Sequence, residues 1–457
     1  MSIHLKINGN FHLDDTTREL IGGSITAFLL KILGAILTYV LNVYVARTLG
    51  AEGAGIYFLA VTLVTMTAIS CRLGFDDVVV RHVASMASAE RWIRVKGVLT
   101  RALTISAGCA LLFTVILYLS AGFLAQTFFD KPDLTRPLQL LSLRILPSVV
   151  LMLVGSAFRG LKQISLAMIL QNVFFPLSVL GALVLWVHPV GIEGIIWTIV
   201  AAAGANGLLA WVIWQRRTPH LRHINGEFGS NELLNAGLPL LAVTLLEQVM
   251  MWSAIIALGY FATSSAVGVY SAAAKTATLS RFMLAPISII MAPRFAELYF
   301  RGHQEMLVNL ARTTTSWMII ASLPILLILV IFPEPIMRIF GSGFQSGSMV
   351  LIILAGSEFV NVLTGPVNQL LIMSGHERDL RDVYLLAAVL CVLFHIILVP
   401  LYGVNDAALT TTLVLVLQKL LTLLRVRRRL GFWPLPGMNN MTILDDKING
   451  NYSPNRK

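Results

Sequence analysis

Seven charged side chains stand inside otherwise apolar stretches of this sequence, and chemistry is expected first from them. Five are cations and two are carboxylates: Lys31, Arg144, Lys275, Arg281, Lys419, Glu247 and Glu358. A charge at the centre of a membrane-spanning helix costs about 2.5–3.5 kcal/mol on insertion scales, so such residues normally face protein or water. The excess of cations predicts a positively lined chamber, which would lower the free energy needed to take an anionic group out of water.

The depth of each cation within its apolar stretch limits what it can do. Lys31 and Arg281 lie deep, so each is expected either to face the chamber or to pair with a carboxylate. Arg144 and Lys275 lie nearer an end, where a long side chain can reach the interface instead of the chamber. Lys419 stands toward the inner end of the last stretch, where reaching the interface is favoured over lining the chamber.

The two carboxylates, Glu247 and Glu358, lie near the middle of their stretches. Desolvation favours the protonated form of a carboxylate in hydrocarbon, so such a group can load and release a proton near neutral pH. One interpretation is therefore an ion-coupling site that takes up a cation or a proton. The alternative is a static ion pair with Lys31 or Arg281.

The remaining polar residues of these stretches point to packing rather than catalysis. His395 is expected to be a hydrogen-bonded core histidine, and the amide side chains are expected to bond between helices. The sequence contains no GxxxxGK[ST] phosphate loop, no HExxH and no GxSxG. We therefore expect no catalytic residue, no metal site, no cofactor and no enzyme activity.

The elements that position these residues are membrane-spanning helices. Mean hydropathy is +0.79, and only 12% of residues are charged, against about 25% in soluble domains. A helical span needs about 20 apolar residues. Twelve such stretches are predicted, at 20–46, 54–73, 102–125, 138–158, 164–187, 191–214, 234–261, 268–293, 314–333, 349–373, 383–402 and 405–426.

Short motifs recur along the chain at a nearly constant distance. Gly55-Ile56-Tyr57 returns as Gly268-Val269-Tyr270, 213 residues later, and Gly191-Ile192 returns as Gly403-Val404 at an offset of 212. The offset predicts two homologous lobes, and repeat interfaces are where transporters bind their substrates. The expected organisation is a tail at 1–18, an N-lobe at 19–217, a linker at 218–232, a C-lobe at 233–430 and a tail at 431–457.

The net charge of +11 is distributed unevenly across the predicted membrane rather than gathered for nucleic acid. Lys and Arg assigned to alternate sides of the twelve stretches number 22 on the side of both termini and four on the other. The positive-inside rule then predicts cytoplasmic termini. With six spans per lobe, the predicted fold is an all-α integral membrane protein whose twelve transmembrane helices form two parallel six-helix lobes.

Residues 44–57, Tyr-Val-Ala-Arg-Thr-Leu-Gly-Ala-Glu-Gly-Ala-Gly-Ile-Tyr, resemble the first-span signature of oligosaccharide (O-antigen/polysaccharide) flippases. These belong to the multidrug/oligosaccharidyl-lipid/polysaccharide exporter superfamily. Residues 267–275 fit the same family's pattern after the seventh span, and the resemblance covers about 20–430. The lipid II flippase of this superfamily usually has fourteen spans, whereas twelve are predicted here.

The resemblance implies alternating-access translocation of polyprenyl-diphosphate-linked oligosaccharide for O-antigen, capsule or exopolysaccharide synthesis. It implies the bacterial inner (plasma) membrane as the location. The implied partners are the lipid-linked oligosaccharide, the bilayer, a coupling H+ or Na+ and other polysaccharide assembly proteins. Drug extruders of the superfamily often carry coupling carboxylates on spans seven and ten, which hold Glu247 and Glu358 here.

Two other functions stay open at this point. One is a multidrug or toxin extruder acting as an antiporter, although a cationic chamber would disfavour cationic drugs. The other is a membrane enzyme of polysaccharide assembly, although such enzymes need a large outer loop and none is found in the sequence.

Overall fold

The computed structural model describes residues 15–185, 191–221, 224 and 226–436, and the regular elements of that part of the chain are helices. Uniformly apolar segments form helices in a membrane because each backbone polar group must be satisfied within its own segment. The α-helices are α1 (Asp15–Cys71), α2 (Phe75–Ser88), α3 (Trp92–Phe123), α4 (Thr135–Ser142), α5 (Ile145–Gly160), α6 (Ile164–Met168), α7 (Phe175–Leu185), α8 (Gly191–Arg217), α9 (Ser230–Phe261), α10 (Ser264–Ala277), α11 (Leu284–Phe300), α12 (Gln304–Ile331), α13 (Pro333–Arg338), α14 (Ser348–Leu363), α15 (Val367–Met373), α16 (Glu377–Tyr402) and α17 (Val404–Leu430).

The predicted fold class, an all-helical multi-pass membrane protein, is confirmed. Among the described residues, nine helices are long and apolar enough to cross a membrane, or ten if the bent pair α4–α5 counts as one span. This count is consistent with twelve stretches. The helix α1 runs through the first two of them, and the eighth is divided between α10 and α11.

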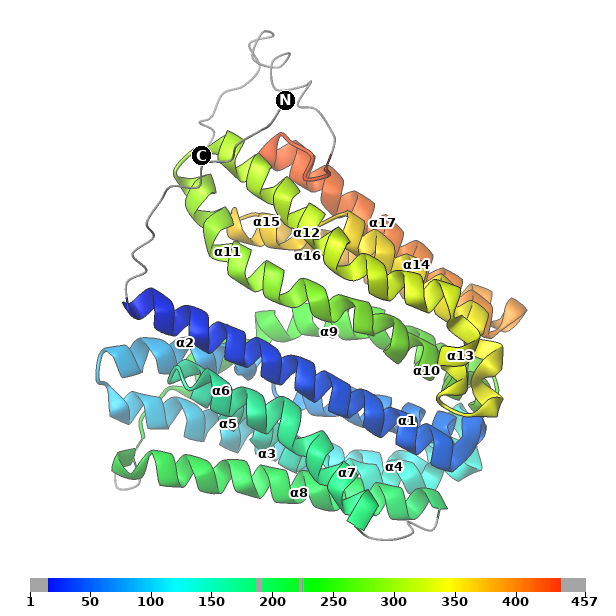
Figure 1. Cartoon of the computed structure of the whole chain (residues 1–457). Helices are drawn as coiled ribbons and strands as arrows, with labels where there is room; N and C mark the ends of the chain where they lie inside the picture. Colours follow the sequence, from blue (N-terminus) through cyan, green and yellow to red (C-terminus); the bar gives the residue numbers. More distant parts are fainter. Residues whose placement is uncertain (1–14, 186–190, 222–223, 225, 437–457) are drawn as a thin grey trace, which may run out of the picture.

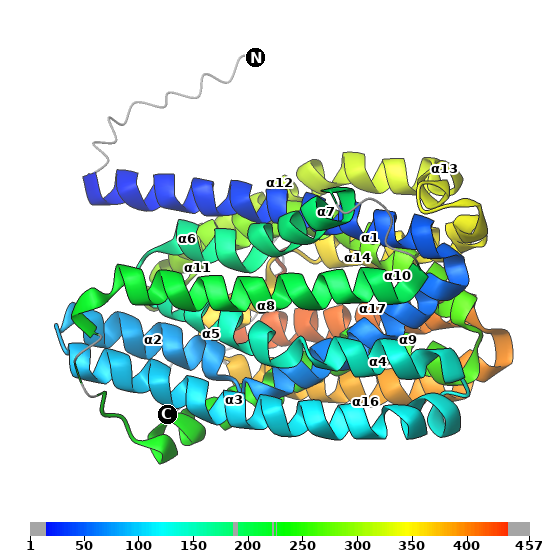
Figure 2. The ribbon, with the colours of Figure 1, turned by 90° about the horizontal axis from the view of Figure 1, so that it is seen from below.

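Two helical bundles pack against each other (Figure 1). One contains α1 to α8 and the other α9 to α17, as the sequence repeat implies. The bundles meet where α1, α10 and α13 come together, and α1 and α11 diverge toward the end where α1 begins, while α2 and α9 keep the bundles in contact at Gly74 and Gly237 (Figure 1). Seen from below, the long helices of both bundles run along a common direction, as spans of one membrane must (Figure 2).

Glycine and proline determine where the spans bend. Gly50 interrupts α1 with φ of 67° and so separates the first two predicted spans, in a conformation that glycine adopts without steric penalty. The 44° bend between α4 and α5 lies just before Pro147, and the π-helix 169–174 lies just before Pro176. Proline lacks the N–H of the helical ladder and its ring displaces the carbonyl four residues earlier, so the helix yields on that side.

The two bundles touch backbone to backbone at the repeated glycine motifs. A Cβ on Gly55 of α1 would overlap the carbonyl oxygen of Ser264 in α10, and a Cβ on Gly268 would overlap that of Ala51. Ala51 and Ser264 are 213 residues apart, as are Gly55 and Gly268, so the contact obeys the internal repeat. We call this contact the glycine crossing. It closes the end of the molecule opposite the start of α1, which the charge distribution of the sequence predicts to be the outer end.

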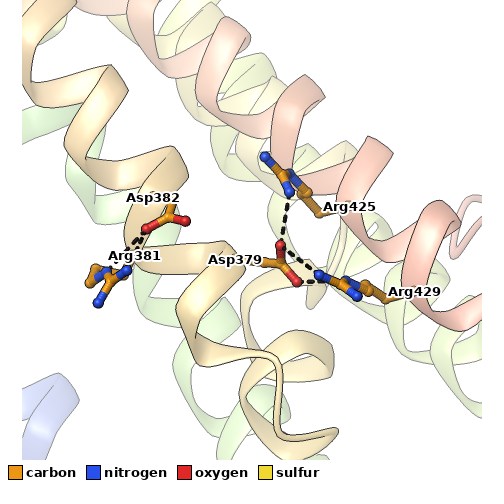
Figure 3. A network of polar contacts seen from close by, with 5 residues as sticks. All are labelled: Asp379, Arg381, Asp382, Arg425 and Arg429. Carbon is orange, nitrogen blue, oxygen red and sulfur yellow. Dashed lines mark hydrogen bonds and ion pairs between the residues drawn. The ribbon is translucent and has the colours of Figure 1, made fainter. Parts of the chain in front are cut away.

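An ion-pair cluster ties the inner ends of α16 and α17 (Figure 3). The carboxylate of Asp379 accepts from Arg425 Nη1 at 2.8 Å and from Arg429 Nε at 2.7 Å. Asp379 is buried, whereas the neighbouring pair Arg381–Asp382 is exposed. The buried carboxylate therefore holds two helices together where the exposed pair does not.

We expect Gly55→Ala and Gly268→Ala to separate the outer ends of the bundles, because each added methyl group overlaps a backbone carbonyl that cannot move alone. Overpacking of this kind costs about 1–3 kcal/mol, or about a tenfold shift toward outward-open molecules. The measurement is the spin-label distance between Asp133 and Ser342. Gly108→Ala and Gly356→Ala are the controls, because a Cβ at either position meets nothing within 4 Å. If the label distance in Gly55→Ala and Gly268→Ala equals that of the native protein, the glycine crossing does not hold the bundles together.

We expect Asp379→Asn to lower the stability of the C-terminal bundle by about 1–2 kcal/mol, since hydrogen bonds to charged groups are lost. Thermal unfolding followed by intrinsic fluorescence measures this. Asp382→Asn, which removes only an exposed pair, should leave the unfolding temperature almost unchanged. Equal effects in the two variants would argue against a special role for the buried carboxylate.

Candidate functional site

A cavity of about 460 Å³ opens inside the C-terminal bundle, between α9, α10, α14, α16 and α17. Four of the seven predicted site residues line it: Glu247, Lys275, Glu358 and Lys419. The cavity therefore brings together two cations and both predicted carboxylates.

Two of these charged residues, Glu358 and Lys419, are well buried. Glu358 is 3% exposed and accepts from the Asn361 amide at 3.3 Å. Lys419 is 7% exposed, so it lines the cavity instead of reaching the interface. Glu247 is the exposed member of the set, on α9.

Uncharged polar groups complete the lining. They include Gln248, Tyr270, Ser271, Asn361, Asn368, Tyr384, Thr411 and Gln418. Amides and hydroxyls both donate and accept hydrogen bonds, as the hydroxyls of a sugar require. The sequence reasoning placed the amides between helices but did not single out Tyr270, Tyr384 or Thr411 as site residues. For Tyr270 the repeated motif was the available signal.

Two of the predicted cations, Lys275 of the cavity and Arg144, also lie near aromatic rings. The ammonium of Lys275 lies 5.0 Å from the ring centroid of Phe58, and Phe58 is 5.4 Å from the ring of Tyr57. Arg144 lies close to Tyr57 and 5.5 Å from the ring of Phe175. Cation–π contacts of this kind partly offset the loss of water around a buried charge.

The other predicted cations are not gathered in the cavity. Lys31 is partly exposed on α1 and is not among the residues that line it. The side chain of Arg281 lies outside the part of the chain whose side chains the structure describes. The chamber that the sequence predicts between the lobes thus corresponds, in the described residues, to a polar cavity within one of them.

An apolar groove of about 430 Å³ lies beside this cavity. It joins Met66 and Phe128 of the N-terminal bundle to α9 and α16 of the C-terminal bundle. Its other lining residues are Val249, Ser253, Ile256, Ala257, Tyr260, Phe261, Val392, His395 and Ile396. The groove is chemically suited to a hydrocarbon chain.

Two cations of the N-terminal bundle fasten the outer ends together. Lys131 Nζ donates to the carbonyls of Gly259 and Ala262, at 2.6 and 2.9 Å, where α9 ends. Arg47 Nε donates to the carbonyl of Ile339 at 2.6 Å. A cation at a helix C-terminus is also favoured by the helix dipole. We call these two contacts the outer latches.

The geometry defines a class of protein. Two helical bundles that meet at one end and hold a polar cavity are an architecture found among membrane transporters. The inward-facing conformation of a multidrug resistance MATE family transporter of the MOP superfamily aligns with a TM-score of 0.73 and 14% identity, covering 89% of this chain and 98% of that one. Lipid II flippase MurJ, in its inward closed conformation, aligns with a TM-score of 0.70 and 14% identity, covering 95% and 94%.

The sequence comparison is more specific. Residues 20–299 match the family described as polysaccharide biosynthesis protein, and the chain belongs to this family. The probable low-salt glycan biosynthesis flippase Agl15 of Haloferax volcanii is 22% identical over 405 residues, which cover 86% of this chain and 81% of that protein. The predicted membership of the oligosaccharide flippase group in this superfamily is confirmed.

Removing the ammonium of Lys131 should loosen the outer latches. Lys131→Met leaves the carbonyls at the end of α9 without their charged donor, so we expect at least about a tenfold shift away from the inward-facing form. Spin labels at Ser88 and Gln304, on the inner ends, should then move closer together. Arg136→Met removes a nearby cation that, unlike Lys131, is exposed, and it should not change this distance.

The same latch should depend on pH. Burial lowers the pKa of Lys131 from the ordinary 10.5, although the neighbouring charge of Asp130 opposes the shift. The ammonium is therefore present below the lowered pKa and lost as pH rises through it, at a lower pH than for an exposed lysine. If the distance between the labels at Ser88 and Gln304 stays constant across alkaline pH in the native protein, and equals the distance in Lys131→Met, Lys131 does not hold the bundles together.

Proposed function

We propose that this protein is a flippase that translocates polyprenyl-diphosphate-linked oligosaccharides across the inner (plasma) membrane by alternating access. The termini would face the cytoplasm, and the product would serve the synthesis of a surface polysaccharide such as O-antigen, capsule or exopolysaccharide. The observation that carries the proposal is a polar, lysine-bearing cavity beside an apolar groove in a chain of the polysaccharide biosynthesis family.

The head group of such a substrate combines a diphosphate with sugars. Lys275 and Lys419 supply positive charge inside the cavity, and lysine binds phosphate as a point charge. The surrounding amides and hydroxyls supply the mixed donors and acceptors that sugar hydroxyls need. Charge and polarity thus support one ligand with an anionic and a polyol part.

The lipid tail has different requirements. A polyprenyl chain gains nothing by entering a polar cavity, and its burial in apolar surroundings is favourable by about 0.8 kcal/mol per CH₂ group. The apolar groove between the bundles would let the tail remain in lipid contact while the head group occupies the cavity. The protein then moves its substrate without forming or breaking a covalent bond.

Transport against a gradient needs an energy source. We propose coupling to H+ or Na+, with Glu247 and Glu358 as the carboxylates that exchange the ion, since both line the cavity. The static ion pair remains the competing interpretation for Glu358. Other polysaccharide assembly proteins are the proposed partners on either side of the membrane.

The direct test is transport by the purified protein in proteoliposomes that contain a fluorescent polyprenyl-diphosphate oligosaccharide. Lectin binding from outside measures the fraction of head groups that have crossed. We expect Lys275→Met and Lys419→Met each to raise the substrate concentration for half-maximal transport about tenfold. Each substitution removes a charged hydrogen-bond donor to the head group. Arg217→Met, at the exposed end of α8, is the matched control.

Deletion in the native cell separates the alternatives. A flippase predicts loss of the surface glycan and accumulation of its lipid-linked precursor in the inner leaflet. An extruder of small molecules predicts drug sensitivity with an intact glycan. Chemical conversion of the lipid-linked sugar by the purified protein would instead identify an enzyme of the same pathway.

A further inference from the structure

A second polar cluster lies in the wall between the cavity and the apolar groove. Its centre is His395 of α16, which is 1% exposed. Ser253 of α9 and His395 line the groove, whereas Cys391 and Thr411 line the cavity. The imidazole is thus a titratable group that stands between the groove and the cavity.

Both ring nitrogens of His395 face acceptors. Nδ1 lies 2.7 Å from the carbonyl oxygen of Cys391, so in the neutral ring Nδ1 must carry the proton. Nε2 lies 3.4 Å from Thr411 Oγ1, whose own hydrogen is donated to the Ala407 carbonyl at 2.8 Å. The Ala407 carbonyl also faces the ring. A neutral imidazole therefore directs a lone pair at oxygen lone pairs, whereas an imidazolium would donate on both sides.

We propose that His395 is a proton-binding site of the C-terminal bundle and that the ion coupled to transport is H+. This inference rests on the proposed ion-coupled transport and specifies its ion. A hydronium ion in the cavity gives its proton to the Nε2 lone pair: one O–H bond breaks, one N–H bond forms, and a water molecule is left. The charge of the bundle rises by one.

A hydroxyl chain leads from the cavity to this nitrogen. Tyr270 lines the cavity and its hydroxyl lies 3.0 Å from Thr411 Oγ1, which in turn faces His395 Nε2. Because the hydrogen of Thr411 is committed to Ala407, Tyr270 is the donor of this pair. Hydroxyl groups in such a chain can pass a proton by reorientation.

The charged and titratable groups that line the cavity or the groove beside His395 bear on the balance of its two states. They are Cys391 on α16, Glu247 and Tyr260 on α9, Tyr270 and Lys275 on α10, Glu358 on α14 and Lys419 on α17. The ring's own hydrogen-bond partners are uncharged groups, so desolvation opposes the imidazolium while its acceptors favour it. Anionic head groups in the cavity would favour the protonated state, and this links cargo to proton.

The cluster is placed to affect the bundle interface. Ser253 Oγ lies 3.3 Å from His395 Nδ1 and 3.2 Å from Cys391 Sγ. It stands on α9, whose end receives Lys131 at Gly259 and Ala262. The positive charge gained at Nε2 is shared by the whole ring, so it strengthens the contact of Nδ1 with Ser253 on the helix that carries the outer latch.

The test uses the full protein in lipid nanodiscs without substrate, with spin labels at Ser88 and Gln304. We expect the inward-facing fraction to change with a midpoint between about pH 5 and 8, where histidine titrates, and His395→Gln to abolish this change. His303→Gln, an exposed histidine between α11 and α12, should behave like the native protein. A full pH response in His395→Gln would overturn the proposal.

A second variant guards against misfolding of the first. Thr411→Val removes an acceptor for the imidazolium while the ring remains, so the midpoint should fall by about one pH unit. An unchanged midpoint there, or a shift produced by Na+ at fixed pH, would also refute a proton site.

The two proposals can fail separately. A pH response that depends on His395 without any movement of lipid-linked oligosaccharide would retain the proton site and remove the flippase. Gradient-driven transport that is equal in the native protein and His395→Gln would retain the flippase and remove the proton site. If Glu247→Gln with Glu358→Gln keeps the pH response, the histidine acts independently of the carboxylates.

Discussion

The glycine crossing is the constraint on which the rest of the structure depends. Two helices can approach backbone to backbone only where no side chain stands between them. Gly55 and Gly268, one in each half of the repeat, have no side chain at this contact. The contact is steric and non-polar, so it can form and separate without leaving unpaired hydrogen-bonding groups. Around it, Lys131 and Arg47 add a few charge-assisted hydrogen bonds that are easily exchanged for water.

The position of the cavity has a mechanistic implication. It lies within the C-terminal bundle and not midway between the two halves, although the sequence repeat predicts two like-built halves. In the N-terminal bundle, Arg144 packs on the ring of Phe175 and is not among the residues that line the cavity. The repeat therefore matches how the bundles meet, while the proposed binding of the head group falls to the C-terminal bundle.

Much of the fold was predictable from sequence because it follows from local rules. Apolar length predicts spans, and the repeated Gly268-Val269-Tyr270 motif predicts two bundles. The gathering of Glu247, Lys275, Glu358 and Lys419 in one cavity was not predictable, because it depends on which faces of five helices point inward. His395 is the buried, hydrogen-bonded histidine that the sequence predicts, but the identity of the acceptor at each ring nitrogen depends on the packing of α16 against α17 and was not predictable.

The outer latches have an evolutionary consequence. Their acceptors are main-chain carbonyls of Gly259, Ala262 and Ile339, which every amino-acid type provides. The receiving segments can therefore drift in sequence without losing the fastening, while the donor positions cannot. Homologues should accordingly differ freely at 262 and 339 yet retain long basic side chains at 47 and 131, an asymmetry that an alignment of relatives would reveal as conserved residues facing variable ones.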